Sequence, residues 1–532
     1  MSVLTLILIG ALGALAAEAF VRTTGSPQYS WQGKGAAFFI LTPMIGALAA
    51  LSVLAFVPWP FLAATICLSA LAVLVIISNT KLAVLRQVYA AQDVENIRHM
   101  VMYPTFYLVH LGTARTVAGA LLLGVIAALL IAFDTPRLLP VEGVPPVARW
   151  GLGLLAWWGG YRVLMALASL IVREDRRDRL GLTGDPNRDT ARFGLFATIL
   201  LHSLLIRDRR HLRPLSYRYA RHLSQPETLK PPHIIAVQAE SYMDLGRVDR
   251  LCGGPQDWPS LERLRQQGTV TGKLDVPAWG AYTMQTEMGF LSTIPHADYR
   301  TSGINPYLSL ASRQKVWSLA AALKAHGYRT LCLHPAKRGF FRRADVMPNL
   351  GFDDFITLEA FQDAPRFGPY VSDAALGDHI KLLMDESDQP LFIQAVTIES
   401  HGPWLPGRLD NTPVKETDLM ASEPTDDLAF ALYRQHMENV VRLAEDLLTA
   451  GTKGQPVAMA LYGDHQPTHG PLFERLGLDD PAVDYLLAHS HQPPLARISG
   501  GPKCVTELGP DLLRLAGFDI SAISGAATKE QQ

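Results

Sequence analysis

The run PVAMALYGDHQP, Pro456–Pro467, decides how the rest of this 532-residue sequence is interpreted. Its first half is almost wholly apolar, which is typical of a strand buried on both faces of a parallel sheet. The run then ends in two adjacent ionisable residues, Asp464 and His465. Taken alone, such an ending fits an ordinary turn after a strand, so its meaning depends on how the other predicted strands end.

Three further apolar runs end in the same way. HIIAVQAES reaches Glu240, YRTLCLHP reaches His334, and PLFIQAVTIESHGPW reaches His401. From about residue 231 onward these runs alternate with amphipathic stretches and Gly/Pro turns, which predicts an α/β domain with a central, mainly parallel sheet. Sites in such sheets form outside the carboxyl ends of the strands. Because four runs deliver an ionisable residue to that edge, we expect a functional site there.

Glu240, Asp464 and His465 together predict a metal centre at this edge. Carboxylate oxygens and an imidazole nitrogen form a mixed set that suits Zn²⁺ or Mn²⁺. Three protein ligands would leave one coordination position for a nucleophile or for a substrate oxygen.

The candidate nucleophile lies in TGKLDVPAWGAYTMQTEMGFL, Thr271–Leu291. Here we predict a short strand, a turn, and a helix that starts near Thr283. A hydroxyl at a helix N-terminus stands where anions are favoured, and beside a metal it can lose its proton and attack phosphorus. The alternative is a plain N-cap, formed by Thr283 or by Thr286.

The hydrophobic excess of the chain is concentrated before about residue 175. A bilayer span needs about 20 mostly apolar residues. The alternative, buried helices of a large soluble protein, fits poorly, because the run LLLGVIAALLIAF has no polar face. We therefore predict an α-helical membrane domain, residues 1–173, with about five spans: Val3–Phe20, Ala36–Val57, Pro60–Ile77, Val117–Phe133 and Leu152–Val172.

Residues 174–230 form a predicted connector between the membrane domain and the α/β domain. Its apolar run Phe193–Ile206 is short and contains His202, which favours a helix lying on the membrane over a sixth span. The basic flank RDRRHLRPLSYRYARH would then meet anionic headgroups. Lys and Arg are normally more frequent in cytoplasmic loops, and their distribution over the predicted loops would place the C-terminal part in the cytoplasm.

Net charge and cysteine spacing argue against several classes of protein. The net charge of −1 argues against a nucleic-acid partner. No CxxC pair supports a zinc ribbon or a redox motif, although a Cys252–Cys504 disulfide is conceivable. The N-terminus has no basic region or cleavage site typical of a signal peptide. Residues 521–532 are expected to be a flexible tail.

The motifs VQAES, YTMQTE, LHPAKRGFFRR, TIESHGPW and LYGDHQP, in this order, resemble the lipoteichoic acid synthase and phosphoglycerol transferase family. That family belongs to the alkaline phosphatase superfamily and has a sulfatase-like catalytic domain. The resemblance covers about residues 231–475 and extends loosely over the membrane half. It implies a catalytic domain over residues 231–520.

The resemblance also implies roles for single residues. Glu240, Thr283, Asp464 and His465 match the family's metal ligands. Thr283 also matches the nucleophile that carries the phosphoglycerol group in a covalent intermediate.

The substrate pocket of the family matches a second group of residues, His334, Phe341, Arg343 and His401. Arg343 and His401 would hold phosphate oxygens and the leaving group, as a planar guanidinium and an imidazole can. For Arg343 the alternative is a solvated basic turn. Phe341 occupies a position where the family has tryptophan, so the identity of the transferred head group stays open.

The implied function is a membrane-anchored, Mn²⁺- or Zn²⁺-dependent transferase of the cell envelope. It would move glycerol phosphate from phosphatidylglycerol, or another phospholipid of the bilayer, to a glycan or polyglycerol-phosphate acceptor. The family places its catalytic domain outside the bacterial cytoplasmic (inner) membrane, against the charge count. Alternatives are a phosphoethanolamine transferase, a phosphodiester hydrolase, and a non-catalytic membrane scaffold. A sulfatase would need a C/S-x-P-x-R motif, which TMQTE does not offer.

Overall fold

The structure is a computed structural model of the chain, which forms two compact units, Met1–Asp208 and Arg209–Gln532. The expected domain boundaries at residues 173 and 230 stay predictions. The described residues are 3–24, 33–57, 59–94, 124, 128, 132, 146–207, 210, 212–224, 230–252, 258–266, 268–422, 426–450, 455–491 and 498–522.

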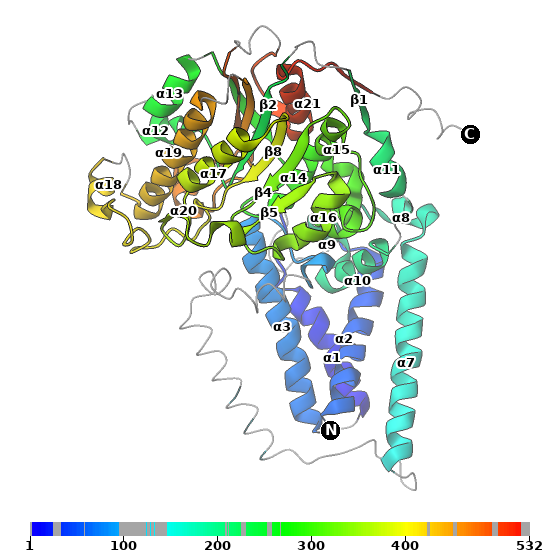
Figure 1. Ribbon diagram of the computed structural model, residues 1–532. Coiled ribbons are helices and arrows are strands. Elements are labelled where there is room, and N and C mark those ends of the chain that lie inside the picture. Colours follow the sequence, from blue (N-terminus) through cyan, green and yellow to red (C-terminus); the bar gives the residue numbers. More distant parts are fainter. Residues whose placement is uncertain are drawn as a thin grey trace. The chain divides into compact units, whose positions relative to one another are not determined.

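Apolar helices dominate the first unit (Figure 1). The longest are α2 (Ala36–Phe56), α3 (Pro60–Leu85) and α7 (Pro146–Ile171). Within them, three segments are long and apolar enough to cross a membrane: Ala36–Leu54, Phe61–Leu85 and Gly153–Ile171. These correspond to the second, third and fifth predicted spans.

The other two predicted spans, the first and the fourth, are not among these three segments. The first is a helix of 16 residues, α1 (Val3–Glu18), which is short for a bilayer span. The fourth, 117–133, lies almost entirely outside the described residues. The prediction of about five spans is therefore supported for three helices among the described residues.

The predicted connector is helical: α8 (Glu174–Leu180), α9 (Pro186–Phe193) and α10 (Leu195–Leu205). His202 on α10 is fully buried, and its Nε2 lies 2.7 Å from the carboxylate of Asp189 on α9. The placement of α10 at a membrane surface stays a prediction.

The second unit is built on an eight-stranded sheet in the order β11-β3-β10-β9-β2-β8-β4-β5. All pairings in it are parallel except the two made by β10, so the sheet is mixed. The four predicted strands are the adjacent, parallel centre of the sheet. Their bounds are β9 (Val457–Gly463), β2 (His233–Ala239), β8 (Leu391–Val396) and β4 (Arg329–Leu333); the others are β3 (Val270–Asp275), β5 (Asp354–Ile356), β10 (Val483–His489) and β11 (Lys503–Cys504).

Alternate residues of the central strands face two separate hydrophobic cores. On β2, Ile234 and Ala236 belong to one core, while Ile235 and Val237 belong to the other. Because both faces of the strand are covered, its sequence is a continuous apolar run and not an alternating one. One core packs against α14 (Thr283–Ser292), α15 (Leu319–Lys324) and α21 (Val505–Leu515), and the other against α12 (Gly246–Cys252), α13 (Pro259–Gln266), α17 (Asp373–Glu386), α19 (Leu428–Thr449) and α20 (Gly470–Leu476) (Figure 1).

The C-terminal strand joins the second unit to its own beginning. β12 (Ile520–Ala522) pairs antiparallel with β1 (Arg221–Leu223), which follows α11 (Leu212–Arg218). The expected flexible tail is therefore wrong at its first two positions, and residues 523–532 lie outside the described part. None of the four cysteines is in a disulfide, so the conceivable Cys252–Cys504 bond is absent.

Candidate metal centre and catalytic site

The two central strands deliver three ligand-type side chains to one edge of the sheet. Glu240 directly follows β2, and Asp464 and His465 directly follow β9. These strands are parallel neighbours, and their last residues, Ala239 and Gly463, are partners in register. The structure therefore brings Glu240, Asp464 and His465 together at the edge where the sequence predicted them.

Gly463 is required here because the chain leaving β2 folds back over the end of β9. A Cβ atom on Gly463 would lie 2.2 Å from the carbonyl oxygen of Tyr242. Ser241, the residue between Glu240 and Tyr242, has a left-handed φ of 57°, which makes this turn sharp. Any larger residue at 463 would push apart the two strand ends that carry the ligand-type side chains.

The three side chains are buried and close to one another. One ligand atom of each lies within 4.8 Å of the others. Nε2 of His465 is 3.4 Å from Oε1 of Glu240 and 3.4 Å from Oδ2 of Asp464. Oδ2 of Asp464 is buried and has no hydrogen-bond partner among the described residues. A divalent cation fits this arrangement, because it would satisfy the orphaned oxygen and the donor set of two carboxylates and one imidazole.

Hydrogen bonds from neighbouring residues orient these side chains. The other oxygen of Asp464, Oδ1, accepts a bond of 2.8 Å from the backbone N–H of Ser241. Nδ1 of His465 lies 3.1 Å from the carbonyl oxygen of Gln466, so a proton on Nδ1 leaves the Nε2 lone pair facing the two carboxylates. Ser241 also donates its hydroxyl to Glu240, at 3.2 Å.

Electrostatics also favour a cation at this place. Burial and the nearby carboxylate of Glu240 raise the pKa of Asp464 to about 6. For His465, burial lowers the pKa, but Asp464 and Glu240 outweigh it and raise the pKa above its ordinary value. Two buried carboxylates thus repel each other, and a positive charge between them would relieve that repulsion.

Thr283 is the first residue of α14 and borders the same site. Its side chain lies close enough to Asp464 to help lower the pKa of that carboxyl. The helix is tied to the end of β9, since Thr286 donates its hydroxyl to the backbone carbonyl of Asp464 at 2.6 Å. The N-cap residue is Tyr282, and no side chain caps the helix, so the plain N-cap alternative for Thr283 or Thr286 is wrong.

His401 lies in a segment that is bound to the strand end carrying Glu240. Thr397 accepts a hydrogen bond of 3.1 Å from the N–H of Glu240, and Ser400 donates its hydroxyl to the carbonyl of Glu240 at 2.7 Å. The ring of His401 packs edge-on against Tyr370, with 5.9 Å between the centroids. The segment that carries His401 is thus fixed to the strand end that carries Glu240.

His334 and Arg343 lie close together below the surface. Burial, together with the nearby guanidinium of Arg343, lowers the pKa of His334 well below its ordinary value. Its Nδ1 lies 3.0 Å from the carbonyl oxygen of Val396. Arg343 is 1% exposed, so the alternative of a solvated basic turn is wrong.

Arg343 forms a buried ion pair that the sequence did not predict. Its Nη2 lies 2.8 Å and its Nε 3.2 Å from Oε2 of Glu287, which is one helical turn after Thr283 on α14. Nη1 is buried and has no partner among the described residues. Both N–H donors of Nη1 are therefore unused among these residues. Phe341 lies against the same guanidinium, 5.6 Å from its ring centroid, and has a left-handed φ of 51°.

A second unpredicted group supports the segment that carries His401. Arg408 donates through Nη2 to the carbonyl oxygens of His401 and Glu399, at 2.8 and 3.0 Å, and through Nη1 to that of Pro403 at 2.8 Å. Its Nε donates to Nε2 of His436 at 2.9 Å, and the same ring bonds through Nδ1 to the carboxylate of Glu399. The sequence LPGRLD around Arg408 carries no signal of this role.

Comparisons with known proteins agree with the geometry. A family model described as Sulfatase matches residues 232–517, which is more than half of the chain. The capsular polysaccharide biosynthesis protein RkpI of Rhizobium meliloti (strain 1021) is 29% identical over 452 residues, 79% of this chain and 77% of its own length. Lipoteichoic acid synthase 1 of Bacillus subtilis (strain 168) is 23% identical over 315 residues, 54% of this chain and 46% of its own length.

One solved structure matches nearly the whole chain in fold. It is the integral membrane protein lipooligosaccharide phosphoethanolamine transferase A (EptA) from Neisseria meningitidis, with a TM-score of 0.54 and 12% identity. The match covers 98% of this chain and 96% of the other. Together these matches confirm the family resemblance carried by the five motifs.

Proposed function

The chain belongs to the sulfatase family, within the alkaline phosphatase superfamily, and on that premise we propose that it is a metal-dependent phosphoglycerol transferase. The observation that carries the proposal is the place of Thr283, at the start of α14 and beside Asp464, which forms a buried cluster with Glu240 and His465. A sulfatase proper would use a different nucleophile, for which the sequence around Thr283 offers no motif.

Glu240, Asp464 and His465 would hold one Mn²⁺ or Zn²⁺ ion, with Thr283 completing the set. The ion would act as a Lewis acid, polarising a phosphoryl oxygen and lowering the pKa of the threonine hydroxyl. The donor set of two carboxylates, one imidazole and one hydroxyl suits either metal.

In the first step, the oxygen of Thr283 attacks phosphorus of the phospholipid. The bond between phosphorus and the diacylglycerol oxygen breaks, and the phosphoglycerol group is then esterified to Thr283. Because Thr283 is the first residue of α14, the exposed N–H groups of the helix start favour the negative charge that develops on the phosphoryl oxygens.

His401 is the proposed proton carrier. It gives a proton to the departing diacylglycerol oxygen and accepts one from the acceptor hydroxyl in the second step, which releases the Thr283 oxygen. Arg343 would contribute Nη1 to a phosphate oxygen, while Glu287 holds the rest of the guanidinium. His334 and Phe341 would line the pocket beside it.

Two observations support a bacterial inner membrane protein: three apolar helices are long enough to cross a membrane, and a solved structure of similar fold is an integral membrane protein. We propose that the second unit lies outside the membrane, where it meets lipid head groups. Phosphatidylglycerol is the proposed donor, as the resemblance to the phosphoglycerol transferase family implies. A glycan or polyglycerol-phosphate acceptor fits the relative named for capsular polysaccharide biosynthesis.

The proposal is tested by giving the purified full-length protein phosphatidylglycerol or phosphatidylethanolamine and measuring diacylglycerol release. We expect release from phosphatidylglycerol that requires added metal and is lost in Thr283→Ala. Release from phosphatidylethanolamine alone would favour a phosphoethanolamine transferase. Release of free glycerol phosphate with no acceptor product would favour a hydrolase. No release from either lipid would favour a non-catalytic scaffold.

A further inference from the structure

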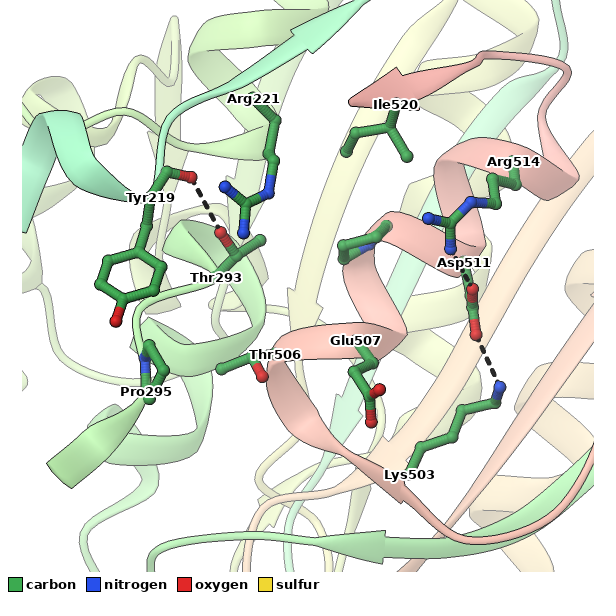
Figure 2. Close-up of a pocket in the computed structure, with 11 residues that line it drawn as sticks. Tyr219, Arg221, Thr293, Pro295, Lys503, Thr506, Glu507, Asp511, Arg514 and Ile520 are labelled. Atoms are coloured by element: carbon green, nitrogen blue, oxygen red, sulfur yellow. Dashed lines mark hydrogen bonds and ion pairs between the residues drawn. The ribbon is translucent and has the colours of Figure 1, made fainter. Parts of the chain in front are cut away.

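A cavity separate from the metal centre lies where β1 and β12 meet α21 (Figure 2). Its volume is about 460 Å³, within the range of roughly 300–1,000 Å³ that is usual for small-molecule sites. None of its lining residues belongs to the metal centre or to the pocket around Arg343. The proposed transfer reaction therefore leaves this cavity without a role.

Three basic side chains line the cavity, and two of them are already paired. Nζ of Lys503 lies 2.7 Å from the carboxylate of Asp511, and Nη1 of Arg514 lies 2.6 Å from the same group. Arg221 differs, because the one hydrogen bond of its side chain among the described residues is a long one of 3.4 Å, from Nη1 to the carbonyl of Ala220. A guanidinium has five N–H donors, so most donors of Arg221 are unused.

The rest of the lining offers hydrogen-bond acceptors. Thr293 donates its hydroxyl proton to the carbonyl of Tyr219 at 3.1 Å, and Thr506 donates its own to the sulfur of Cys504 at 3.3 Å. Both hydroxyl oxygens therefore remain as acceptors. Figure 2 shows the guanidinium of Arg221 beside Thr293, with Thr506 and Glu507 on the facing wall. One guanidinium with unused donors and several acceptors match a ligand that has one anionic group and several hydroxyls.

We propose that this cavity is a second binding site, which takes a phosphate- or carboxylate-bearing saccharide or glycerol unit. Arg221 binds the anionic group through its planar fork, and the oxygens of Thr293, Thr506 and Glu507 accept hydrogen bonds from ligand hydroxyls. The cavity lies near the opposite end of α14 from Thr283, about 15 Å away for a helix of this length. A small ligand bound there cannot contact Thr283, so the site is distinct from the catalytic one.

The proposal is tested by calorimetric titration of the full-length protein in detergent. The probes are sn-glycerol 1-phosphate and glucuronate, with uncharged glucose as the control ligand. All titrations use the Asp464→Asn background, which weakens anion binding at the metal centre. We expect at least one anionic probe to bind and Arg221→Gln to weaken that binding about tenfold or more, since a charge-assisted fork is lost.

Two further variants sharpen the result. Arg221→Lys keeps the charge without the fork and should bind with intermediate affinity. Arg442→Gln removes an exposed arginine on α19, outside the cavity, and should change nothing. Equal affinity in Arg221→Gln and the parent, or binding of neither anionic probe, would overturn the proposal. Because the test measures binding alone, it can fail while the transferase proposal stands, and the reverse also holds.

Discussion

The carboxylate of Glu287 lies 2.8 Å from the guanidinium of Arg343, and both side chains are fully buried. The two residues are 56 positions apart, one on the helix that begins with Thr283 and the other at the start of the short helix α16 (Arg343–Val346). This ion pair therefore joins the helix of the proposed nucleophile to the segment that forms the proposed substrate pocket. Burial lowers the pKa of Arg343, but Glu287 outweighs it, so the guanidinium stays charged.

Breaking this pair should destabilise the protein strongly. Glu287→Gln leaves the charge of Arg343 buried and uncompensated, which typically costs about 3–5 kcal/mol. We expect a clear fall in the urea midpoint of the full-length protein in detergent, followed by tryptophan fluorescence. The double variant Glu287→Met/Arg343→Met should recover much of the loss, because it removes both charges. A single variant as stable as wild type would contradict this account of the pair.

Arg408 is a positioning residue whose effect should appear in turnover. Arg408→Lys keeps a positive charge but cannot reach the carbonyls of Glu399, His401 and Pro403 together. We expect a fall of about 10- to 100-fold in kcat, with little change in KM or metal content, since a misplaced proton carrier affects the chemical step. Arg442→Lys, on the exposed surface of α19, is the matched control. An unchanged kcat, or a loss of bound metal, would contradict the positioning role.

Stability should fall as the pH drops below about 6.5, partly because of His469. Burial lowers the pKa of this residue from 6.5 to about 3, and its ring is stacked on Trp404. Between these two values the unfolded chain binds a proton that the folded chain excludes, so acid favours unfolding by about 1.4 kcal/mol for each pH unit.

The variant His469→Phe isolates this effect. Phenylalanine fills the same aromatic surroundings and does not titrate, so its stability should fall less steeply than that of wild type below pH 6.5. The measurement is the difference in urea midpoint between the two proteins at pH 7 and pH 5. Parallel pH profiles for the two proteins would show that His469 does not exclude a proton.

Substitutions of two aspartates should have different effects on the amount of bound metal. Asp464→Asn removes a charge and an orphaned oxygen from the cluster, so bound Mn²⁺ or Zn²⁺ should be lost, with at least a tenfold rise in Kd. Asp480→Asn changes a half-exposed carboxylate paired with Lys273 and should leave metal content unchanged. Elemental analysis of the purified proteins checks this. Equal metal content in both variants would contradict the assignment.

The strand ends were the most predictable part of the site. Fully apolar runs identify strands covered on both faces, and parallel neighbours bring their carboxyl ends to one edge. That reasoning placed Glu240, Asp464 and His465 together, and the helix start at Thr283 followed from the turn before it. These predictions depend on local patterns, which is why one sequence suffices for them.

Contacts between distant elements were not predictable in this way. The turn KRGFFRR looks exposed because it is rich in charge, yet Arg343 is buried, since Glu287 from another element neutralises it. Arg408 reads as an ordinary loop residue, and its four acceptors are fixed only by the fold. The antiparallel strand β10 also escaped prediction. Its run VDYLLAH ends in His489, but that residue pairs with Ala458 near the start of β9 and so lies away from the site edge.

The most direct test of the central claim is mass spectrometry of the protein after incubation with phosphatidylglycerol and metal but no acceptor. We expect a phosphoglycerol adduct on the peptide containing Thr283, absent from Thr283→Ala and from wild type treated with a chelator. An adduct on a different residue, or none at all while diacylglycerol is still released, would contradict it.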